Sequence, residues 1–487
     1  MSALPPWLRP AAVLLLCALP GAAQEADFAA KLYRSGARAY ADKAYKEALE
    51  TWNQLLQSAP RSEFAPRVLL ELARYQVEVA KKPEAAFPYL DRLKTEYIRS
   101  PWAAEGLLLR GELLARQARR PADLKDAMAE FHRVVDLFPE HPAVAAAHLQ
   151  LGLAWRDQGQ WDPALQHFIF AYRLRPDGPE APRALLEAAG TLDLTGDLPG
   201  CLRLLQRVRT EFPRSPLAAE AAWRLAVLVK LRIAKPPLRL EGPWPAGKAK
   251  WLKTPILLAT SATGDLFLFQ NDLDHAFRLK EGELAPVGPP AAGTRALVPT
   301  PDDGLWLLSR NGLLKEDGTT TPLGALYAIT GGRVDRWGNL WVADARTPAL
   351  TLLAPDGTSR TLPSPSAAAL APLPTGGVVV ASDGDRSLHF LDADGQPRIT
   401  VPYGRDLPAP FKYVVALASD PLGHVAALVD GGDYGEGVVV YGPDGAVLRQ
   451  ATLRALGLSG RFTALALDRA GGVILCDRRN DTLFRVD

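Results

Sequence analysis

The sequence predicts a multidomain protein of the α-then-β class, in which an α-solenoid of helical hairpins is followed by a six-bladed β-propeller. Two observations carry this prediction. A helical pattern recurs at intervals of 37 to 41 residues up to about residue 215, and a turn-and-strand pattern recurs six times after residue 255. The chain has 487 residues, of which 48% are hydrophobic and 23% are charged, as in soluble proteins with more than one core.

Residues 1–23 have the composition of a secretory signal peptide. A single basic residue, Arg9, precedes the apolar run Ala11–Leu19, and small residues follow up to Ala23. The apolar run is too short to span a bilayer as a helix, and no later segment is apolar enough, so we expect no transmembrane segment in the mature chain. We therefore expect an exported protein, with an uncleaved or lipid-anchored form as the alternative.

The net charge argues against a nucleic-acid-binding protein, and the cysteines argue against a protein held together by disulfides. The formal net charge is +2 with both signs interspersed, so we expect no nucleic-acid partner. Of the three cysteines, Cys17 falls in the signal peptide, while Cys201 and Cys476 fall in different predicted domains. An internal disulfide is therefore not expected, and a protein of this size does not need one.

The first domain, residues 24–234, contains about five copies of a helical hairpin. A small residue, a second small residue, a large residue and a proline recur at steps of 12, 4 and 8 residues. The full copies are Gly36, Ala48, Trp52 and Pro60; Gly152, Ala164, Phe168 and Pro176; and Ala189, Cys201, Leu205 and Pro213. Small residues let the two helices of a hairpin approach closely, the large residue is expected to fill the gap between one hairpin and the next, and proline ends the second helix. Two looser copies lie between these, and residues 216–234 are expected to form a capping helix.

These residues resemble the tetratricopeptide repeat, with a repeat length closer to its bacterial envelope members. The segments "FPEHPAVA" and "FPRSPLAAEA" are also similar to exported members of that family. The resemblance implies a concave groove that binds a protein or peptide, and a location in the periplasm or cell envelope of a bacterium. The alternative is that the helical array is a rigid spacer that presents the second domain.

Residues 235–254 form a Pro- and Gly-rich linker, and residues 255–487 are expected to form the propeller. A glycine-rich turn leads into a strand six times, at Gly264, Asp303, Gly338, Gly376, Gly423 and Gly471. An acidic residue followed by glycine marks a second hairpin in five of the six units, at Glu281-Gly282, Asp317-Gly318, Asp356-Gly357, Asp394-Gly395 and Asp444-Gly445. Each unit therefore holds four strands, and six such units close into a ring.

The sixth unit lacks its second hairpin, because the sequence ends where its third strand should end. The spare segment Pro237–Gly242 is expected to supply the fourth strand and so to close the ring. The motif "GNLWVAD" at Gly338–Asp344 resembles NHL repeats, a family of six-bladed propellers. That resemblance implies binding of a protein or a glycan; RNA, another ligand of the family, is not expected of an exported protein without a basic face.

Polar residues in the loops between the second and third strands, the b–c loops, are the candidate ligand-binding residues, because these loops share one face of a propeller. They are Asp344, Arg346, Asp383, Asp385, Arg386, Asp430, Asp433, Glu436, Asp477 and Arg478. The alternative is that the aspartates are turn residues. The segment "DGGDYGEG", residues 430–437, is interpreted as a long hairpin loop, since it lacks the ligand spacing of a calcium loop.

No catalytic residue, metal site or cofactor is expected, and the predicted function is that of a non-catalytic exported scaffold or adaptor. The alternative is a metal-dependent lactonase or hydrolase similar to the gluconolactonase propellers. Glu241 in "EGPW" resembles the context of that family's metal-binding glutamate, but the family's Asn-Gly and Asn-Asp motifs have no counterpart in the right places. If Leu238–Leu240 is the closing strand, Glu241 lies in a loop.

Overall fold

The computed structural model describes residues 20–244, 252–261, 263–280, 283–323, 326, 328–335 and 337–487. The chain divides into two compact units, residues 1–117 with 125–150 and residues 118–124 with 151–487. The predicted signal peptide lies outside the described residues except for its last four, with which helix α1 begins. Within the described ranges, every helix is too short or too polar to cross a membrane.

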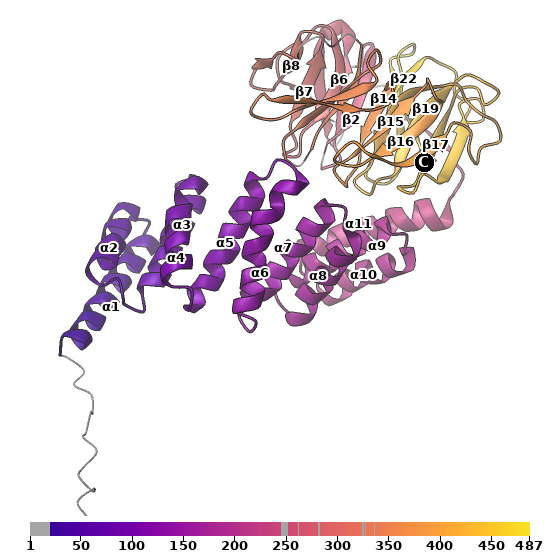
Figure 1. The fold of residues 1–487 in the computed structure, drawn as a ribbon. Coiled ribbons are helices and arrows are strands. Elements are labelled where there is room, and N and C mark those ends of the chain that lie inside the picture. Colours follow the sequence, from indigo (N-terminus) through magenta and orange to yellow (C-terminus); the bar gives the residue numbers. More distant parts are fainter. Residues whose placement is uncertain are drawn as a thin grey trace, which may run out of the picture. The chain divides into compact units, whose positions relative to one another are not determined.

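The first unit is helical, and its helices pack pairwise as hairpins: α1 on α2, α3 on α4 and α5 on α6 (Figure 1). The helices are α1(Pro20–Ala41), α2(Tyr45–Ser58), α3(Ala65–Glu78), α4(Phe87–Glu96), α5(Pro101–Gln117), α6(Lys125–Leu137) and the first part of α7(Ala143–Asp157), with a 3₁₀ turn at η1(Pro83–Ala86). In α2 the buried residues are Ala48, Trp52, Leu55 and Leu56, which form one stripe along the helix. The apolar stripe therefore buries one face of each helix against its neighbours.

Small residues on the first helix of a hairpin face the large residue of the second helix of the same hairpin, whereas the sequence analysis expected the large residue to fill the gap between one hairpin and the next. A Cβ atom added at Gly36 would lie 2.4 Å from the ring of Trp52, and one added at Gly111 would lie 2.5 Å from the ring of Phe131. In the α3–α4 hairpin, Ala73 shares a buried cluster with Leu90. Ala73 and Gly111 are thus the small residues of the two looser copies, and a 3₁₀ turn inserted before the second helix changes their spacing.

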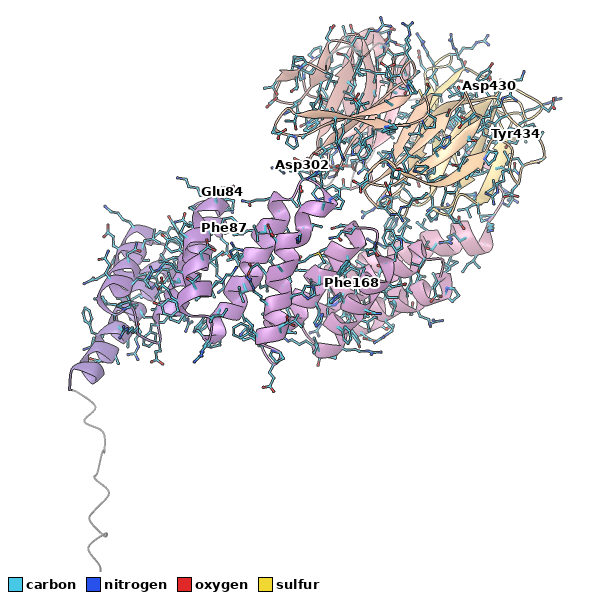
Figure 2. The ribbon with its side chains drawn as sticks, in the orientation of Figure 1. Glu84, Phe87, Phe168, Asp302, Asp430 and Tyr434 are labelled. Atoms are coloured by element: carbon cyan, nitrogen blue, oxygen red, sulfur yellow. The ribbon has the colours of Figure 1, made fainter. Side chains whose placement is uncertain are left out.

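The helical part of the second unit continues the same packing, with α8 on α9 and α10 on both α9 and α11. Its elements are η2(Pro121–Leu124), the end of α7, α8(Trp161–Leu174), α9(Ala181–Leu194), α10(Leu198–Glu211), α11(Pro216–Leu228) and the π-turn η3(Val229–Ala234). Phe168, which is labelled in Figure 2, is completely buried, and a Cβ atom added at Gly152 would meet its ring. The helix predicted over residues 216–234 is therefore α11 with η3, and it ends at Lys235, which has a φ of 42°.

A buried carboxylate joins two helices of this unit. Glu187 on α9 is paired with Arg156 and Arg183. Burial alone would raise the pKa of Glu187, but the guanidinium groups of Arg156, Arg183 and Arg224 together outweigh burial and lower that pKa below its usual value. Glu187 is therefore ionised although it is buried, because the neighbouring arginines stabilise its negative charge.

The remaining part of the second unit is a six-bladed β-propeller, in which each blade is an antiparallel sheet of four strands (Figure 1). Blade 1 is β2(Pro255–Thr260), β3(Leu266–Gln270), β4(His275–Lys280) and β5(Glu283–Val287), and blade 2 is β6(Thr294–Pro299), β7(Leu305–Ser309), β8(Gly312–Leu314) and β9(Thr320–Thr321). Blade 3 is β10(Ile329–Val334), β11(Leu340–Asp344), β12(Ala349–Leu353) and β13(Ser359–Pro363), and blade 4 is β14(Ala369–Pro372), β15(Val378–Ser382), β16(Ser387–Leu391) and β17(Pro397–Pro402). Blade 5 is β18(Tyr413–Ser419), β19(Val425–Asp430), β20(Gly437–Tyr441) and β21(Val447–Thr452).

Blade 6 closes the ring with a strand from each end of the propeller sequence. Its strands are β22(Phe462–Leu467), β23(Val473–Asp477), β24(Thr482–Val486) and β1(Leu240–Pro243), in the order β1-β24-β23-β22. The fourth strand thus comes from the segment expected to supply it, although β1 begins at Leu240 and not at Pro237. Glu241 consequently lies within β1 and not in a loop, which corrects the expectation from the sequence.

The turns between the first and second strands all place one residue in the left-handed region. The residues are Gly264, Asp303, Gly338, Gly376, Gly423 and Gly471, with φ between 69° and 95°. Blade 2 uses aspartate where the other blades use glycine, as the alignment of the repeats indicates. The second predicted hairpins also have glycine at positive φ, at Gly318, Gly357, Gly395 and Gly445, while Glu281-Gly282 lies outside the described residues.

Candidate functional site

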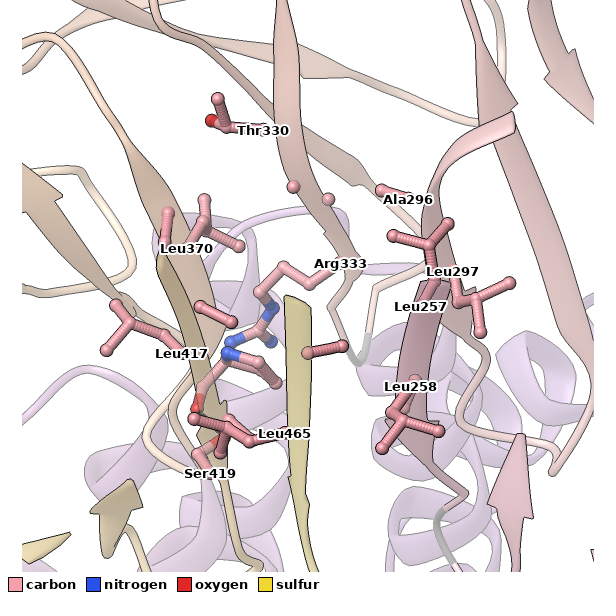
Figure 3. Close-up of a pocket in the computed structure, with 18 of the residues that line it drawn as sticks. Leu257, Leu258, Ala296, Leu297, Thr330, Arg333, Leu370, Leu417, Ser419 and Leu465 are labelled. Atoms are coloured by element: carbon pink, nitrogen blue, oxygen red, sulfur yellow. Dashed lines mark hydrogen bonds between the residues drawn. The ribbon is translucent and has the colours of Figure 1, made fainter. Parts of the chain in front are cut away.

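A cavity of about 210 Å³ lies at the centre of the propeller, where the innermost strands of all six blades meet (Figure 3). Its wall is formed by β2, β6, β10, β14, β18 and β22. Most of the lining side chains are apolar, and the leucines among them are Leu257, Leu258, Leu297, Leu370, Leu417 and Leu465. Among the described lining residues there is no aspartate, glutamate, histidine or cysteine, and the charged ones are Arg295 and Arg333.

Arg333 stands at a position that four of the other blades fill with alanine and blade 2 fills with valine. In the strand register it pairs with Trp341, the second residue of β11. The equivalent residues of the other blades are Ala259, Val298, Ala371, Ala418 and Ala466. Alanine suits the narrow centre of a propeller, so the guanidinium of blade 3 is the exception (Figure 3).

The glycines before Arg333 let β10 lie close to both neighbouring blades. A Cβ atom at Gly331 would meet Leu370 of blade 4 at 3.1 Å, and one at Gly332 would meet Leu308 of blade 2 at 2.3 Å. Arg333 extends toward blade 4, where its Nη1 donates to the carbonyl oxygens of Leu373, at 3.0 Å, and Gly377. One end of the guanidinium is therefore fixed to the first turn of blade 4.

The Nε atom of this guanidinium is buried without a hydrogen-bond partner. Arg333 is only 7% exposed, and its Nε has no hydrogen-bond partner among the described residues. Burial lowers the pKa of Arg333 to about 10, against the opposing influence of Asp335. The group still carries its proton at neutral pH, so a positive charge is held at a cavity whose side chains are mostly apolar.

Arg295 stands at the opposite end of the cavity, near the start of β6, and is exposed to solvent. Val415 on β18 also lines the cavity and is 41% exposed. Exposed residues in the lining mean that the cavity is open to solvent on the side of the b–c loops. An anion entering there would meet one arginine at the mouth and a second one at depth.

The hydroxyl groups of the lining serve the packing between blades. Thr260 donates to the carbonyl oxygen of Leu467 at 2.8 Å, and Thr330 donates to that of Ala367 at 2.8 Å. Ser419 likewise donates to the carbonyl oxygen of Pro372. Each of these bonds joins two neighbouring blades, so these hydroxyl protons are already used within the protein. The charged groups of the lining are Arg295 and Arg333.

Three of the candidate aspartates in the b–c loops hold the loops in place. Asp344 is 1% exposed and accepts from the backbone N–H groups of Arg346, at 2.8 Å, and Ala328, at 3.1 Å. Asp477 is completely buried and accepts from the backbone N–H groups of residues 461 and 479. Asp383 accepts from the hydroxyl of Tyr403 at 3.1 Å, and burial raises its pKa.

The other candidate residues of this face remain a predicted ligand surface. The exposed ones are Arg346, Asp385, Arg386, Asp433, Glu436 and Arg478. Asp430, which is labelled in Figure 2, is half-buried and accepts from the N–H of Gly431. Asp385 is hydrogen-bonded to the ring of His389 at 2.8 Å. In the part of the chain that the structure describes, no three acidic, histidine or cysteine side chains are grouped so that they could hold a metal ion.

Glu241 and the two cysteines lie outside the cavity. Glu241 is on the outermost strand of blade 6, where it pairs with Arg485. Cys201 and Cys476 are unpaired and buried, and burial raises the pKa of each thiol to about 12. The thiols are therefore protonated at neutral pH and are poor nucleophiles.

Sequence reasoning missed Arg333. The sequence signal was present, because "GGRV" stands where the other blades have sequences such as "ALAP" and "ALAL". An arginine in an alanine-rich, innermost strand is a departure from the repeat, and departures of this kind mark candidate sites.

No protein-family model matches this chain, and no curated protein matches it. Among solved structures, a streptogramin B lyase aligns with a TM-score of 0.38 and 12% identity over 51% of this chain and 97% of that chain. The gluconolactonase XC5397 from Xanthomonas campestris aligns with a TM-score of 0.35 and 18% identity over 48% of this chain and 85% of that chain. The MamA protein aligns with a TM-score of 0.31 and 15% identity over 40% of this chain and 95% of that chain. At these scores and identities, none of the three assigns an activity to this chain.

Proposed function

We propose that this protein is a non-catalytic scaffold or adaptor, which is exported to the bacterial periplasm or cell envelope and binds its ligands through two domains. The observation that supports this proposal is the lining of the propeller cavity. General acid–base catalysis needs a titratable group beside the substrate, and metal catalysis needs carboxylate, imidazole or thiolate ligands. The described lining offers apolar side chains, hydroxyls and two arginines, which can bind and orient a molecule but are poorly suited to hydrolysing one.

The helical domain is proposed to bind a protein or peptide. This part of the proposal rests on the resemblance of the repeats to tetratricopeptide hairpins, supported by the pairwise packing of α1 to α6. The exposed residues of the b–c loops are proposed to bind a second protein or a glycan. Two binding domains in one chain would bring two partners together.

Hydrolysis of a lactone is the outcome that would overturn the non-catalytic assignment. The assay measures opening of a six-membered lactone by the full chain with and without added calcium, manganese or zinc. We expect no rate above the buffer rate and no response to Glu241→Gln, because Glu241 lies on the outermost strand. A metal-stimulated rate that disappears in Glu241→Gln would establish the enzyme instead.

Partner capture tests the binding role. The full chain would be cross-linked in the native envelope, beside a variant that carries Asp385→Lys and Glu436→Lys on the b–c face. The matched control carries Glu283→Lys and Asp394→Lys, which make the same charge change at exposed positions on an outermost strand and a second hairpin. Loss of a partner in the first variant but not in the control supports binding at this face; the same partners on all three proteins would contradict it.

A further inference from the structure

Arg67 on α3 lies between two aromatic rings of the first unit. Its guanidinium carbon is 4.8 Å from the centre of the Tyr33 ring on α1 and 4.7 Å from the centre of the Trp102 ring on α5. The ring of Phe64 stacks in turn on that of Tyr33, at 5.2 Å. Helices α1, α3 and α5 are the first helices of consecutive hairpins, so α1 and α5 lie on opposite sides of α3 (Figure 1). The two rings therefore cover both faces of the guanidinium.

The terminal nitrogens of this guanidinium have no partner. Arg67 is half-buried, and its Nε is buried, but Nη1 and Nη2 keep a surface open to solvent. Neither of them forms a hydrogen bond or an ion pair with a described residue. Glu71, four positions along α3, pairs with Arg74 instead, and Arg74 also pairs with Glu105 on α5. Arg67 is therefore a cation that no ion pair neutralises within the described part of the first unit.

We propose that the stack formed by Phe64, Tyr33, Arg67 and Trp102 binds an extended acidic segment of a partner protein, in which one side-chain carboxylate accepts from Nη1 and Nη2 of Arg67. The two oxygens of a carboxylate match two nitrogens of a guanidinium, and bonds between charged groups are stronger than neutral ones. The rings already fix the guanidinium, so little side-chain freedom is lost on binding. The inference rests on the proposed binding of a protein or peptide by the helical domain and names the chemistry of that partner.

The order of the groups along the array defines the residues beside the carboxylate. A half-buried ring stands on each side of the guanidinium, one from Tyr33 and one from Trp102. In an extended chain, side chains two positions apart point the same way and are about 7 Å apart. An acidic residue on Arg67 would therefore bring the residues two positions before and after it toward the two rings. We expect both to be apolar, whereas a carboxylate at the end of a chain would leave one ring uncovered and a phosphate ion would leave both uncovered.

A peptide with one glutamate between two leucines tests this pattern. The probe is the capped, fluorescein-labelled peptide Ser-Ser-Leu-Ser-Glu-Ser-Leu-Ser-Ser, and its binding to the full chain is followed by fluorescence anisotropy. One control peptide has glutamine in place of glutamate, and a second has the same composition in the order Ser-Ser-Leu-Ser-Leu-Ser-Glu-Ser-Ser. We expect the probe to bind about tenfold or more tightly than the glutamine peptide, because only the carboxylate forms a charge-assisted pair. We expect the reordered peptide to bind more weakly than the probe, since one ring loses its apolar contact.

Two substitutions at Arg67 and one control locate the binding. Arg67→Met keeps an unbranched chain but removes the charge, and should abolish the preference for glutamate over glutamine. Arg67→Lys keeps the charge but not the planar pair of nitrogens, and should retain part of that preference. Lys46→Met removes a positive charge from a side chain on α2 that is 93% exposed, and should bind like wild type.

The inference is overturned if wild type binds the probe no better than the glutamine peptide, if the reordered peptide binds as tightly as the probe, or if a folded Arg67→Met variant keeps the preference. Inorganic phosphate that binds as tightly as the probe would also overturn it, because the rings would then play no part. A role for Arg67 only in packing three helices predicts the first of these results. Because the wild-type comparison needs no variant, it decides the inference even if Arg67→Met does not fold. Cross-linked partners of the full chain are identified separately, so a failure of the peptide preference leaves a result on the proposed function intact.

Discussion

Replacement of Gly152 by alanine tests how closely the helices of a hairpin approach. A Cβ atom at Gly152 on α7 would lie 2.5 Å from two ring carbons of Phe168 on α8. Ordinary contacts between carbon atoms are about 3.5–4.0 Å long. The ring would have to move by about 1 Å, yet Phe168 is completely buried and its neighbours leave it little room.

The expected magnitude is the difference between two opposing effects. Overpacking of this kind costs about 1–3 kcal/mol. Alanine in place of glycine within a helix contributes about 1 kcal/mol of stability. Because the overlap at Gly152 is severe, we expect the cost to prevail, with a net loss of about 1–2 kcal/mol.

Gly190 on α9 provides the matched control. The nearest atom to a Cβ at Gly190 is a guanidinium nitrogen of Arg224 at 3.7 Å, which is an ordinary contact. Gly190→Ala should therefore raise stability by up to about 1 kcal/mol. Thermal unfolding followed by circular dichroism at the helical band measures both variants. We expect shifts in melting temperature at or below about 2–4 °C per kcal/mol, because the unit that contains both glycines is larger than the 150–250 residues for which that range holds.

The critical result is that Gly152→Ala lowers the free energy of unfolding while Gly190→Ala raises it. If Gly152→Ala is as stable as wild type, the close packing of α7 on α8 is contradicted. A second substitution sharpens the test, because Phe168→Leu should cost less stability in the Gly152→Ala background than in wild type. Additive effects would show that the two residues do not meet.

Three further predictions concern turns, thiols and acid stability. Gly357→Ala should lower the free energy of unfolding by about 1 kcal/mol because Gly357 has a φ of 86°, and no atom within 4 Å of the added Cβ would contribute a clash. Gly384 has no positive φ, so Gly384→Ala should have little effect in the same unfolding measurement. Cys201 and Cys476 should not react with a thiol-specific disulfide reagent at pH 8 until the chain unfolds, because the pKa of each is about 12; rapid labelling of the native protein would contradict this. Glu187 has a folded-state pKa below its unfolded value of about 4.3. Its contribution to stability is therefore present above that pH and is lost as the pH falls through the folded-state pKa. Glu187→Gln should cost about 3 kcal/mol at pH 7 and flatten the acid dependence of the melting temperature; an unchanged dependence would exclude this group as its source.

The sequence predicts the repeated elements well because their physical causes are local. Helix α2 ends at Ser58 and α8 at Leu174, each two residues before a proline that marks the end of a repeat. The turns of the propeller need positive φ, and the alignment of the repeats identifies the position even where Asp303 replaces glycine. Turn chemistry and helical periodicity are visible within one repeat, so no distant contact is needed to infer them.

Features that depend on a distant partner are less visible in the sequence. The start of β1 at Leu240 follows from its pairing with β24, and a strand can shift in register without any change in its own pattern. Asp344 and Asp477 are typical exposed turn residues by type, but both are buried because they bind backbone N–H groups near the start of the first strand of their own blades. The candidate site at Arg333 depends on where six separate strands converge, which only the folded ring defines.

The pairing of β1 with β24 in blade 6 affects how fast the propeller can fold. Glu241 and Arg485 are 244 positions apart, so the sheet that holds them cannot form until both ends of the propeller sequence are present. Contacts of such long range form slowly because the intervening chain must first be ordered. During that delay the outer edge of β24 would be open to other strands, whereas the helical hairpins can fold on their neighbours alone. The propeller is therefore the part of the chain in which a folding helper would have the greatest effect.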